Sequence, residues 1–333
     1  SGTAEFLYNK DVNGVYYIDA NLPAASTSFV GADSRPRWTA GNNIYSNIAD
    51  AVVLKNQNVG KSWNITASAE KSFQKGFWAK VGYRYGESRN TVDPGSIAFG
   101  SWNNNPHSGD PNNPGVAYSA NSPGHRFFIA ASYSFEYFDF GRTGSSVFWD
   151  RYTGGNASYT FSGDLNGDGG TSNDLIYIPR DPSEMNFQEF SSGGVTYTAA
   201  AQAAAWDAYI AQDSYLSEHR GQYAERGAVF LPMVNKVDLS FTQDVFTNLG
   251  GKRHAFQFRL DINNFMNLLN SDWGVSQRLV SNQPLTARGA DSQGRALYRM
   301  RVVNGALMDH SLEPTAGLGD VWRLQLSVRY TFQ

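Results

Sequence analysis

The chain has 333 residues, enough for two average soluble domains or for one large β structure. Tyr, Phe, Gly and Asn are abundant and only 17% of the residues are charged, a composition that favours strands and turns over helices. A formal net charge of -3 gives no electrostatic basis for binding nucleic acid, and the lack of cysteine excludes disulfides and thiolate metal sites. No run of about 18 apolar residues occurs, so a transmembrane helix is excluded, whereas a β-barrel stays compatible because half of each strand faces water.

The N-terminal third of the chain is predicted to form strands in which apolar and polar residues alternate. Residues 3–21 are interpreted as one long strand with a bulge, and residues 49–71 as a second strand after a polar loop. A short turn leads to a strand at 77–86, and a long loop rich in Asn, Pro and Gly follows at 87–124.

The middle of the chain continues this pattern and then interrupts it. Strands predicted at 126–137 and 145–152 are joined by a short connection. The largest irregular region, 153–231, contains a predicted helix at 199–212, which Thr198 can cap at its N-terminus.

Five strands are predicted in the C-terminal third, at 234–246, 256–263, 275–290, 298–302 and 321–332. The last of them alternates most regularly and has one wholly apolar face and one wholly polar face. Arginines, hydroxyls and amides fill the polar positions. The apolar positions are Trp322, Leu324, Leu326, Val328, Tyr330 and Phe332.

Short and long connections alternate along the whole chain, so one end of the structure has tight turns and the other has long loops. Outer-membrane barrels have this asymmetry, with short periplasmic turns and longer extracellular loops, and their aromatic residues gather near strand ends. The predicted fold class is therefore all-β, a transmembrane antiparallel β-barrel with about ten strands in this chain. A soluble lipocalin-like barrel or sandwich would turn its apolar face toward a core, and loops of roughly 25 to 80 residues are unusual there.

Several longer motifs carry a family resemblance. They are DLNGDG at 164–169 with SNDLIYIP at 172–179, LSEHRGQYAER at 216–226, VDLSF at 237–241 and DINNFMNLLN at 261–270. NVGK at 58–61 before a strand, and a final strand that ends in an aromatic residue, add to them. Together these motifs resemble the C-terminal part of TonB-dependent outer-membrane receptors, most closely the Oar-like (OmpA-related) group, and the resemblance extends over essentially the whole chain.

The resemblance implies a barrel of about 22 strands that is closed around a plug, in the bacterial outer membrane. Residues 1–333 are then expected to be the C-terminal part of the barrel domain, with the plug domain absent from this chain. The implied partners are outer-membrane lipid, the remaining barrel strands and plug of the same receptor, and the barrel-assembly machinery during insertion. A TonB-type energy-coupling protein is expected to act through the plug.

Residues 164–169 match the first half of an EF-hand calcium loop, with oxygen ligands at alternate positions and Gly at the sharp turn. Leu175 stands where a bidentate Glu belongs, but the carboxylate next to it could replace that ligand. The predicted calcium ligands are Asp164, Asn166, Asp168 and Asp174. The alternative is a turn rich in Asp and Asn in an extracellular loop.

Two other groups of polar residues have a functional and a structural interpretation. The cluster around His219, Arg220 and Glu225 lacks the motifs of a hydrolase or a phosphate loop, so we expect a packing network and no enzyme activity. Charged residues on the polar strand faces could line a substrate path or contact a plug, or pair with one another on a wet barrel wall. They are Lys80, Arg84, Glu136, Arg259, Asp261, Arg323 and Arg329.

Two functional hypotheses follow. The first is a part of an energised transporter that moves a substrate across the outer membrane. The second is a passive pore, or a structural or surface-binding outer-membrane barrel, without energy coupling. A soluble enzyme is a more distant alternative.

Overall fold

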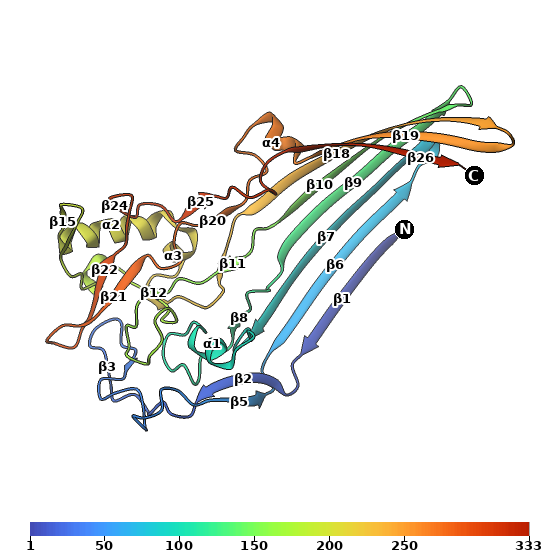
Figure 1. The fold of residues 1–333 in the computed structure, drawn as a ribbon. Coiled ribbons are helices and arrows are strands. Elements are labelled where there is room, and N and C mark those ends of the chain that lie inside the picture. The colour runs from blue at the N-terminus through green and yellow to red at the C-terminus, as the bar shows by residue number, and fades with distance from the viewer. Residues whose placement is uncertain (333) are drawn as a thin grey trace.

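The computed structural model describes residues 1–332 and has an all-β architecture dominated by one antiparallel sheet (Figure 1). Eight long strands lie side by side in this sheet, and the two-residue strand β8 (Ala117–Tyr118) pairs with the end of one of them. In spatial order the long strands are β1 (Gly2–Lys10), β6 (Lys61–Ser72), β7 (Phe77–Asn90), β9 (Gly124–Tyr137), β10 (Gly141–Thr153), β18 (Met233–Leu249), β19 (Lys252–Asn263) and β26 (Arg323–Phe332).

Each long strand pairs with the next long strand along the chain, so the sheet is an up-and-down meander. The register places apolar residues opposite apolar residues, as with Phe6 and Ile65 at one edge and Phe258 and Val328 at the other. Strands β1 and β26 form the two edges, and neither pairs with a further strand within residues 1–332. The described sheet is therefore open.

The three short connections lie together at one end of the sheet, at η1 (Gln74–Gly76), residues 138–140 and residues 250–251. The turn between β9 and β10 has positive φ at both Phe138 (55°) and Asp139 (52°), the backbone that a tight hairpin needs to match the twist of its strands. Both ends of the chain lie on the side of these turns (Figure 1). The predicted asymmetry of tight turns and long loops is confirmed.

The four long connections, residues 11–60, 91–123, 154–232 and 264–322, lie at the other end of the sheet and form what we call the loop module (Figure 1). Its helices are α1 (Ala98–Asn103), η2 (Pro182–Glu184), α2 (Ala199–Gln212), α3 (Ser214–Glu218) and α4 (Phe265–Leu269). Besides β8, its short strands are β2 (Gly14–Asp19), β3 (Thr27–Ser28), β4 (Pro36–Arg37), β5 (Val52–Gln57), β11 (Asn156–Ala157), β12 (Phe161–Ser162), β13 (Tyr177–Ile178), β14 (Phe190–Ser192), β15 (Val195–Tyr197), β16 (Gln222–Tyr223), β17 (Val229–Phe230), β20 (Gln277–Leu279), β21 (Leu285–Ala290), β22 (Ala296–Met300), β23 (Val302–Val303), β24 (Ala306–Leu307) and β25 (Leu312–Pro314).

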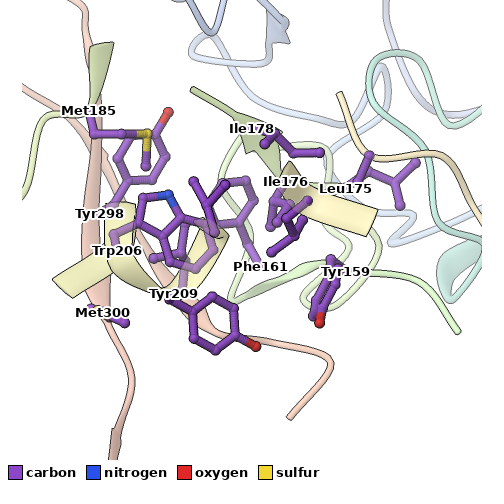
Figure 2. Close-up of a cluster of buried hydrophobic side chains, with 14 of the residues drawn as sticks. Tyr159, Phe161, Leu175, Ile176, Ile178, Met185, Trp206, Tyr209, Tyr298 and Met300 are labelled. Carbon is purple, nitrogen blue, oxygen red and sulfur yellow. The ribbon is translucent and has the colours of Figure 1, made fainter. Parts of the chain in front are cut away.

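The hydrophobic core lies in the loop module and not against the large sheet. Three of the four connections contribute to its main cluster, in which Phe161 stacks on Tyr298 and Trp206 stacks on Tyr209 (Figure 2). Helix α2 supplies Trp206 and Tyr209, and its predicted cap is confirmed because the Thr198 side chain accepts a hydrogen bond from the backbone N–H of Ala201. A smaller cluster joins the first and second connections through Tyr17, Leu22, Trp38, Val92 and Trp102.

Two predicted features of the large sheet are wrong. The strands expected at 275–290 and 298–302 do not join it, because β21 pairs with β22 on one side and with β12 on the other in a small separate sheet. Their alternating residues Leu285, Tyr298 and Met300 are buried in the core of the loop module, which explains the periodic pattern. The large sheet therefore has eight long strands where about ten were predicted.

The first predicted strand is also divided. Strand β1 ends at Lys10, Asn13 has positive φ (55°), and β2 then pairs with β5 in a sheet of its own. The strand predicted at 49–71 breaks correspondingly between β5 and β6. No helix within residues 1–332 is long and apolar enough to cross a membrane.

Candidate functional site

The large sheet presents one continuous apolar face, and the loop module does not cover it. The side chains of Leu326 and Val328 are 75% and 66% exposed, and Phe258 on the neighbouring strand is 49% exposed. Val234 is the one buried apolar residue of the eight long strands within residues 1–332. The exposed apolar face consists of Phe6, Tyr8, Ile65, Phe77, Val81, Phe127, Ile129, Tyr133, Phe135, Phe241, Val245, Leu249, Phe256, Phe258, Leu324, Leu326, Val328, Tyr330 and Phe332.

An exposed surface of this kind has a high free energy in water. Leaving one such side chain exposed forgoes about 1.5–3 kcal/mol relative to burying it, and apolar patches on soluble monomers rarely exceed a few hundred Å². Seven of the eight long strands, from β1 to β26, contribute exposed side chains to the apolar face, and β10 contributes the half-buried Val147. It therefore requires an apolar surrounding that residues 1–332 do not themselves provide.

The opposite, polar face of the sheet carries ionic contacts between and along strands. Arg126 donates two hydrogen bonds of 3.0 Å to Asp150, and Lys80 lies 3.2 Å from Glu70. Arg259 forms an ion pair of 2.8 Å with Asp261 two residues further along β19. Lys80, Arg259 and Asp261 thus have ionic partners, as expected for a polar wall. Four of the predicted charged residues form no ion pair within residues 1–332: Arg84, Glu136, Arg323 and Arg329.

One row of polar residues crosses five strands near the tight turns. Register places Arg142 opposite both Glu136 and Asp244, and Gln257 opposite both Asp244 and Arg329. A shallow pocket of about 260 Å³ lies along this row. Negative and positive side chains alternate along most of this row, and none of them forms an ion pair with another residue of the described part of the chain. This end of the polar face is therefore available for contacts with charged or polar groups.

The predicted calcium loop forms a turn that is tied by backbone hydrogen bonds. The two oxygens of Asp164 accept hydrogen bonds from the backbone N–H groups of Gly167 (2.6 Å) and Gly169 (2.9 Å). Burial and the neighbouring Asp168 carboxylate raise the pKa of Asp164 to about 6. The Asn166 side chain donates to Asp168 Oδ2 at 3.0 Å, so the structure brings Asp164, Asn166 and Asp168 into one turn.

The fourth predicted ligand, Asp174, has a different partner. Its Oδ1 lies 3.2 Å from the Arg35 guanidinium, and its Oδ2 accepts a hydrogen bond of 2.8 Å from the backbone N–H of Leu165. Within residues 1–332, no group of three or more His, Cys, Asp or Glu residues is arranged to hold a metal ion. Calcium binding by these four residues stays a prediction from the sequence.

Arg35 is the centre of a buried network that sequence reasoning missed. Its Nε donates to Asp33 at 2.9 Å, and its Nη2 donates to the Leu175 carbonyl at 2.7 Å. The hydroxyls of Tyr223 and Tyr298 each donate to Asp33 at 3.0 Å. Burial alone would lower the pKa of Arg35, but Asp33 and Asp174 outweigh it and raise that pKa. The network joins three of the four long connections. Arg35 and Asp174 are 139 positions apart in the chain, so no local sequence motif could predict their contact.

His107 also reaches the predicted calcium turn. Its Nε2 lies 3.2 Å from Asp168 Oδ2, close enough for an ionic contact, although the angle is too poor for a hydrogen bond. Burial would raise the pKa of Asp168, but contact with His107 and hydrogen bonds from Gly170 and Asn166 together outweigh it and lower that pKa. The Asn173 side chain is fully buried nearby in the chain and has no hydrogen-bond partner within residues 1–332. The turn is therefore packed into the module and not held out in solvent.

The cluster at 219–226 is spread over separate contacts. His219 contacts the Tyr215 carbonyl through Nδ1 (2.7 Å), and Arg220 pairs with Asp207 (2.8 Å). Glu225 pairs with Arg89 at the end of β7 (2.6 Å). The pairs of Arg220 and Glu225 join separate segments, as the packing interpretation expects, whereas the His219 contact lies within the end of α3.

No family model, curated protein or solved structure matches the chain.

Proposed function

We propose that this chain is part of a TonB-dependent outer-membrane transporter or receptor of the Oar-like (OmpA-related) type, which moves a substrate across the bacterial outer membrane. The observation that carries the proposal is the exposed apolar face of the eight-stranded sheet. Outer-membrane strands place alternate residues against lipid and against a wet interior, and the two faces of this sheet differ in that way.

The open edges of the sheet support the same proposal. Within residues 1–332, β1 and β26 each leave one row of backbone N–H and C=O groups without a strand partner. In lipid an unpaired edge costs several kcal/mol for each unsatisfied group, so a spanning sheet must close on itself. We infer that the remaining strands of a larger barrel, of about 22 strands in all, pair with these edges.

The other proposed partners follow from the two ends of the sheet. The charged row near the tight turns faces the interior of the proposed barrel, where a plug would sit and a TonB-type energy-coupling protein would act on it. The tight turns would lie in the periplasm and the loop module outside the cell. The barrel-assembly machinery would act on this chain during insertion.

A second candidate function is a surface-binding outer-membrane barrel without energy coupling. The observation that favours it is the extent of order in the loop module, whose main core cluster includes Trp206, Tyr209 and Tyr298 with at most 2% exposure. A rigid platform on the long-loop side suits the binding of a partner whether or not transport follows. A passive pore is the other form of this alternative.

The lipid-facing assignment has a direct test, because the chain contains no cysteine that would compete for a label. Leu326→Cys and Ser327→Cys place a fluorescent maleimide on opposite faces of β26 in protein that is folded in bilayers. We expect brominated lipid chains to quench the Leu326→Cys label and iodide to quench the Ser327→Cys label. Equal quenching of both labels by iodide would contradict the proposed lipid-facing side of β26.

Energy coupling is tested separately in bacteria that express the complete natural protein. An energised transporter must lose function when the TonB-type protein is deleted or the proton gradient is collapsed. A surface-binding barrel must keep its binding under both treatments, and a passive pore must conduct ions in planar bilayers.

A further inference from the structure

A pocket in the loop module lies apart from the calcium turn and from the polar face of the sheet. It encloses about 500 Å³, within the range of about 300–1,000 Å³ that small-molecule sites occupy. The pocket is formed where the loop after β7, helix α1, β8, β11 and the turn at 226–227 meet.

Both charged groups of the pocket are already engaged by the protein. Arg226 is 5% exposed and donates hydrogen bonds to the side chains of Asn105 (2.9 Å) and Asn90 (2.8 Å). Asp93 accepts hydrogen bonds from Ser119, Asn90 and the backbone N–H of Ala120, at 2.6 to 2.8 Å. Burial would raise the pKa of Asp93, but these donors outweigh it and lower that pKa. The two charges therefore shape the site and leave little capacity for a charged ligand.

The polar groups that stay free around the pocket are neutral. Within residues 1–332, the Ser96 hydroxyl has no hydrogen-bond partner, and the Asn104 amide contacts the protein only through its oxygen, at 3.4 Å from Asn103. Ser158 accepts a hydrogen bond from Gly227 (2.8 Å) and keeps its own O–H free to donate. These hydroxyl and amide groups are single donors and acceptors.

Apolar surface completes the pocket. Tyr118 lines it and is held in place by Arg89, whose guanidinium lies 3.8 Å from the centre of the ring. Ile97, Ala120 and Ala157 add aliphatic surface, and Ile97 is 65% exposed at the site. A ligand that fits must combine hydroxyl-type hydrogen bonding with apolar C–H surface.

We propose that this pocket binds a neutral saccharide. A sugar ring offers hydroxyl groups to the free amide and hydroxyls and C–H surface to Tyr118 and Ile97. An anion or cation would lose its hydration for little ionic gain, because the opposite charges of Arg226 and Asp93 already act on each other and both groups are hydrogen-bonded to the protein. Saccharide binding at this pocket requires neither transport nor a lipid environment, so its test does not depend on the proposed function.

The test uses the purified protein on an immobilised panel of oligosaccharides. The neutral members are oligomers of glucose, galactose, mannose and N-acetylglucosamine, and the anionic members are uronate and sialylated oligomers. Ser96→Trp fills the pocket from an exposed position, and Asn104→Ala removes one amide. Ser192→Trp, at the exposed β14–β15 hairpin, is the matched control for adding a bulky side chain.

We expect at least one neutral oligosaccharide to bind, with binding abolished in Ser96→Trp and unchanged in Ser192→Trp. Asn104→Ala should weaken binding about tenfold, the effect of one lost hydrogen bond. Binding to anionic oligomers alone, equal binding by wild type and Ser96→Trp, or binding to no member of the panel would each overturn the proposal. Unfolding curves that match wild type would exclude misfolding of Ser96→Trp as the cause of its loss.

Discussion

Phe258 on β19 lies directly opposite Val328 on β26, and both side chains are exposed. Cross-strand pairs of this kind stabilise a sheet by roughly 0.2–1 kcal/mol each, but they leave the outer surface of both residues uncovered. The same arrangement recurs between Phe6 and Ile65 at the opposite edge of the sheet. The sheet is thus ordered by pairing within its plane, while its apolar face depends on what surrounds the molecule.

A charge placed on this face tests that dependence. If the apolar face meets lipid as proposed, Leu326→Arg should lower the stability of bilayer-inserted protein by about 2–4 kcal/mol, because an arginine near the middle of a membrane must leave water. Ser327→Arg, one residue further on the polar face, should be tolerated. The folded fraction in liposomes is measured by the shift of unheated protein on electrophoresis. Equal folded fractions for the two variants would contradict the assignment of faces.

Arg35 is expected to stabilise the loop module through its two carboxylate partners. Arg35→Ala leaves Asp33 and Asp174 buried without their cation, and breaking a buried pair in this way costs about 3–5 kcal/mol. Arg37→Ala is the matched control, since Arg37 lies over the Phe29 ring and its loss should cost only about 0.5–1 kcal/mol. Denaturant unfolding followed by tryptophan fluorescence measures both. A similar loss in the two variants would show that the buried network is not important for stability.

Asp164 should make the stability of the loop module depend on pH. Its pKa is raised from 3.8 to about 6 in the folded protein, so between these values the folded state binds more protons than the unfolded state. The free energy of unfolding must then fall as the pH rises from about 4 to 7. Asp164→Asn removes this contribution. We expect the wild type to lose stability relative to Asp164→Asn over this range, and parallel pH curves would contradict the raised pKa.

The predicted calcium site is tested by isothermal titration calorimetry. Binding at Asp164, Asn166, Asp168 and Asp174 would produce heat in the wild type that Asp168→Ala loses. Because Arg35 holds Asp174, the prediction also expects Arg35→Ala to change the calcium affinity. Equal heats in the wild type and in Asp168→Ala would end the calcium interpretation.

Local patterns along the chain were sufficient to predict the long strands that end at Tyr137 and Phe332 and their apolar faces. Successive side chains of a strand point to opposite sides, so alternation is visible in any short window of sequence. Helix α2 was predictable for a similar reason, because its Thr198 cap lies next to its first residue. These features arise from contacts between near neighbours.

The loop module was decided by contacts between residues far apart in the chain. The residues around Leu285 and Tyr298 alternate like a strand of the large sheet, yet burial against Phe161 and Trp206 places them in the module. Arg35 reaches Asp174 across 139 positions. Burial of apolar surface and pairing of buried charges depend on which segments meet in space, and only the tertiary structure determines that.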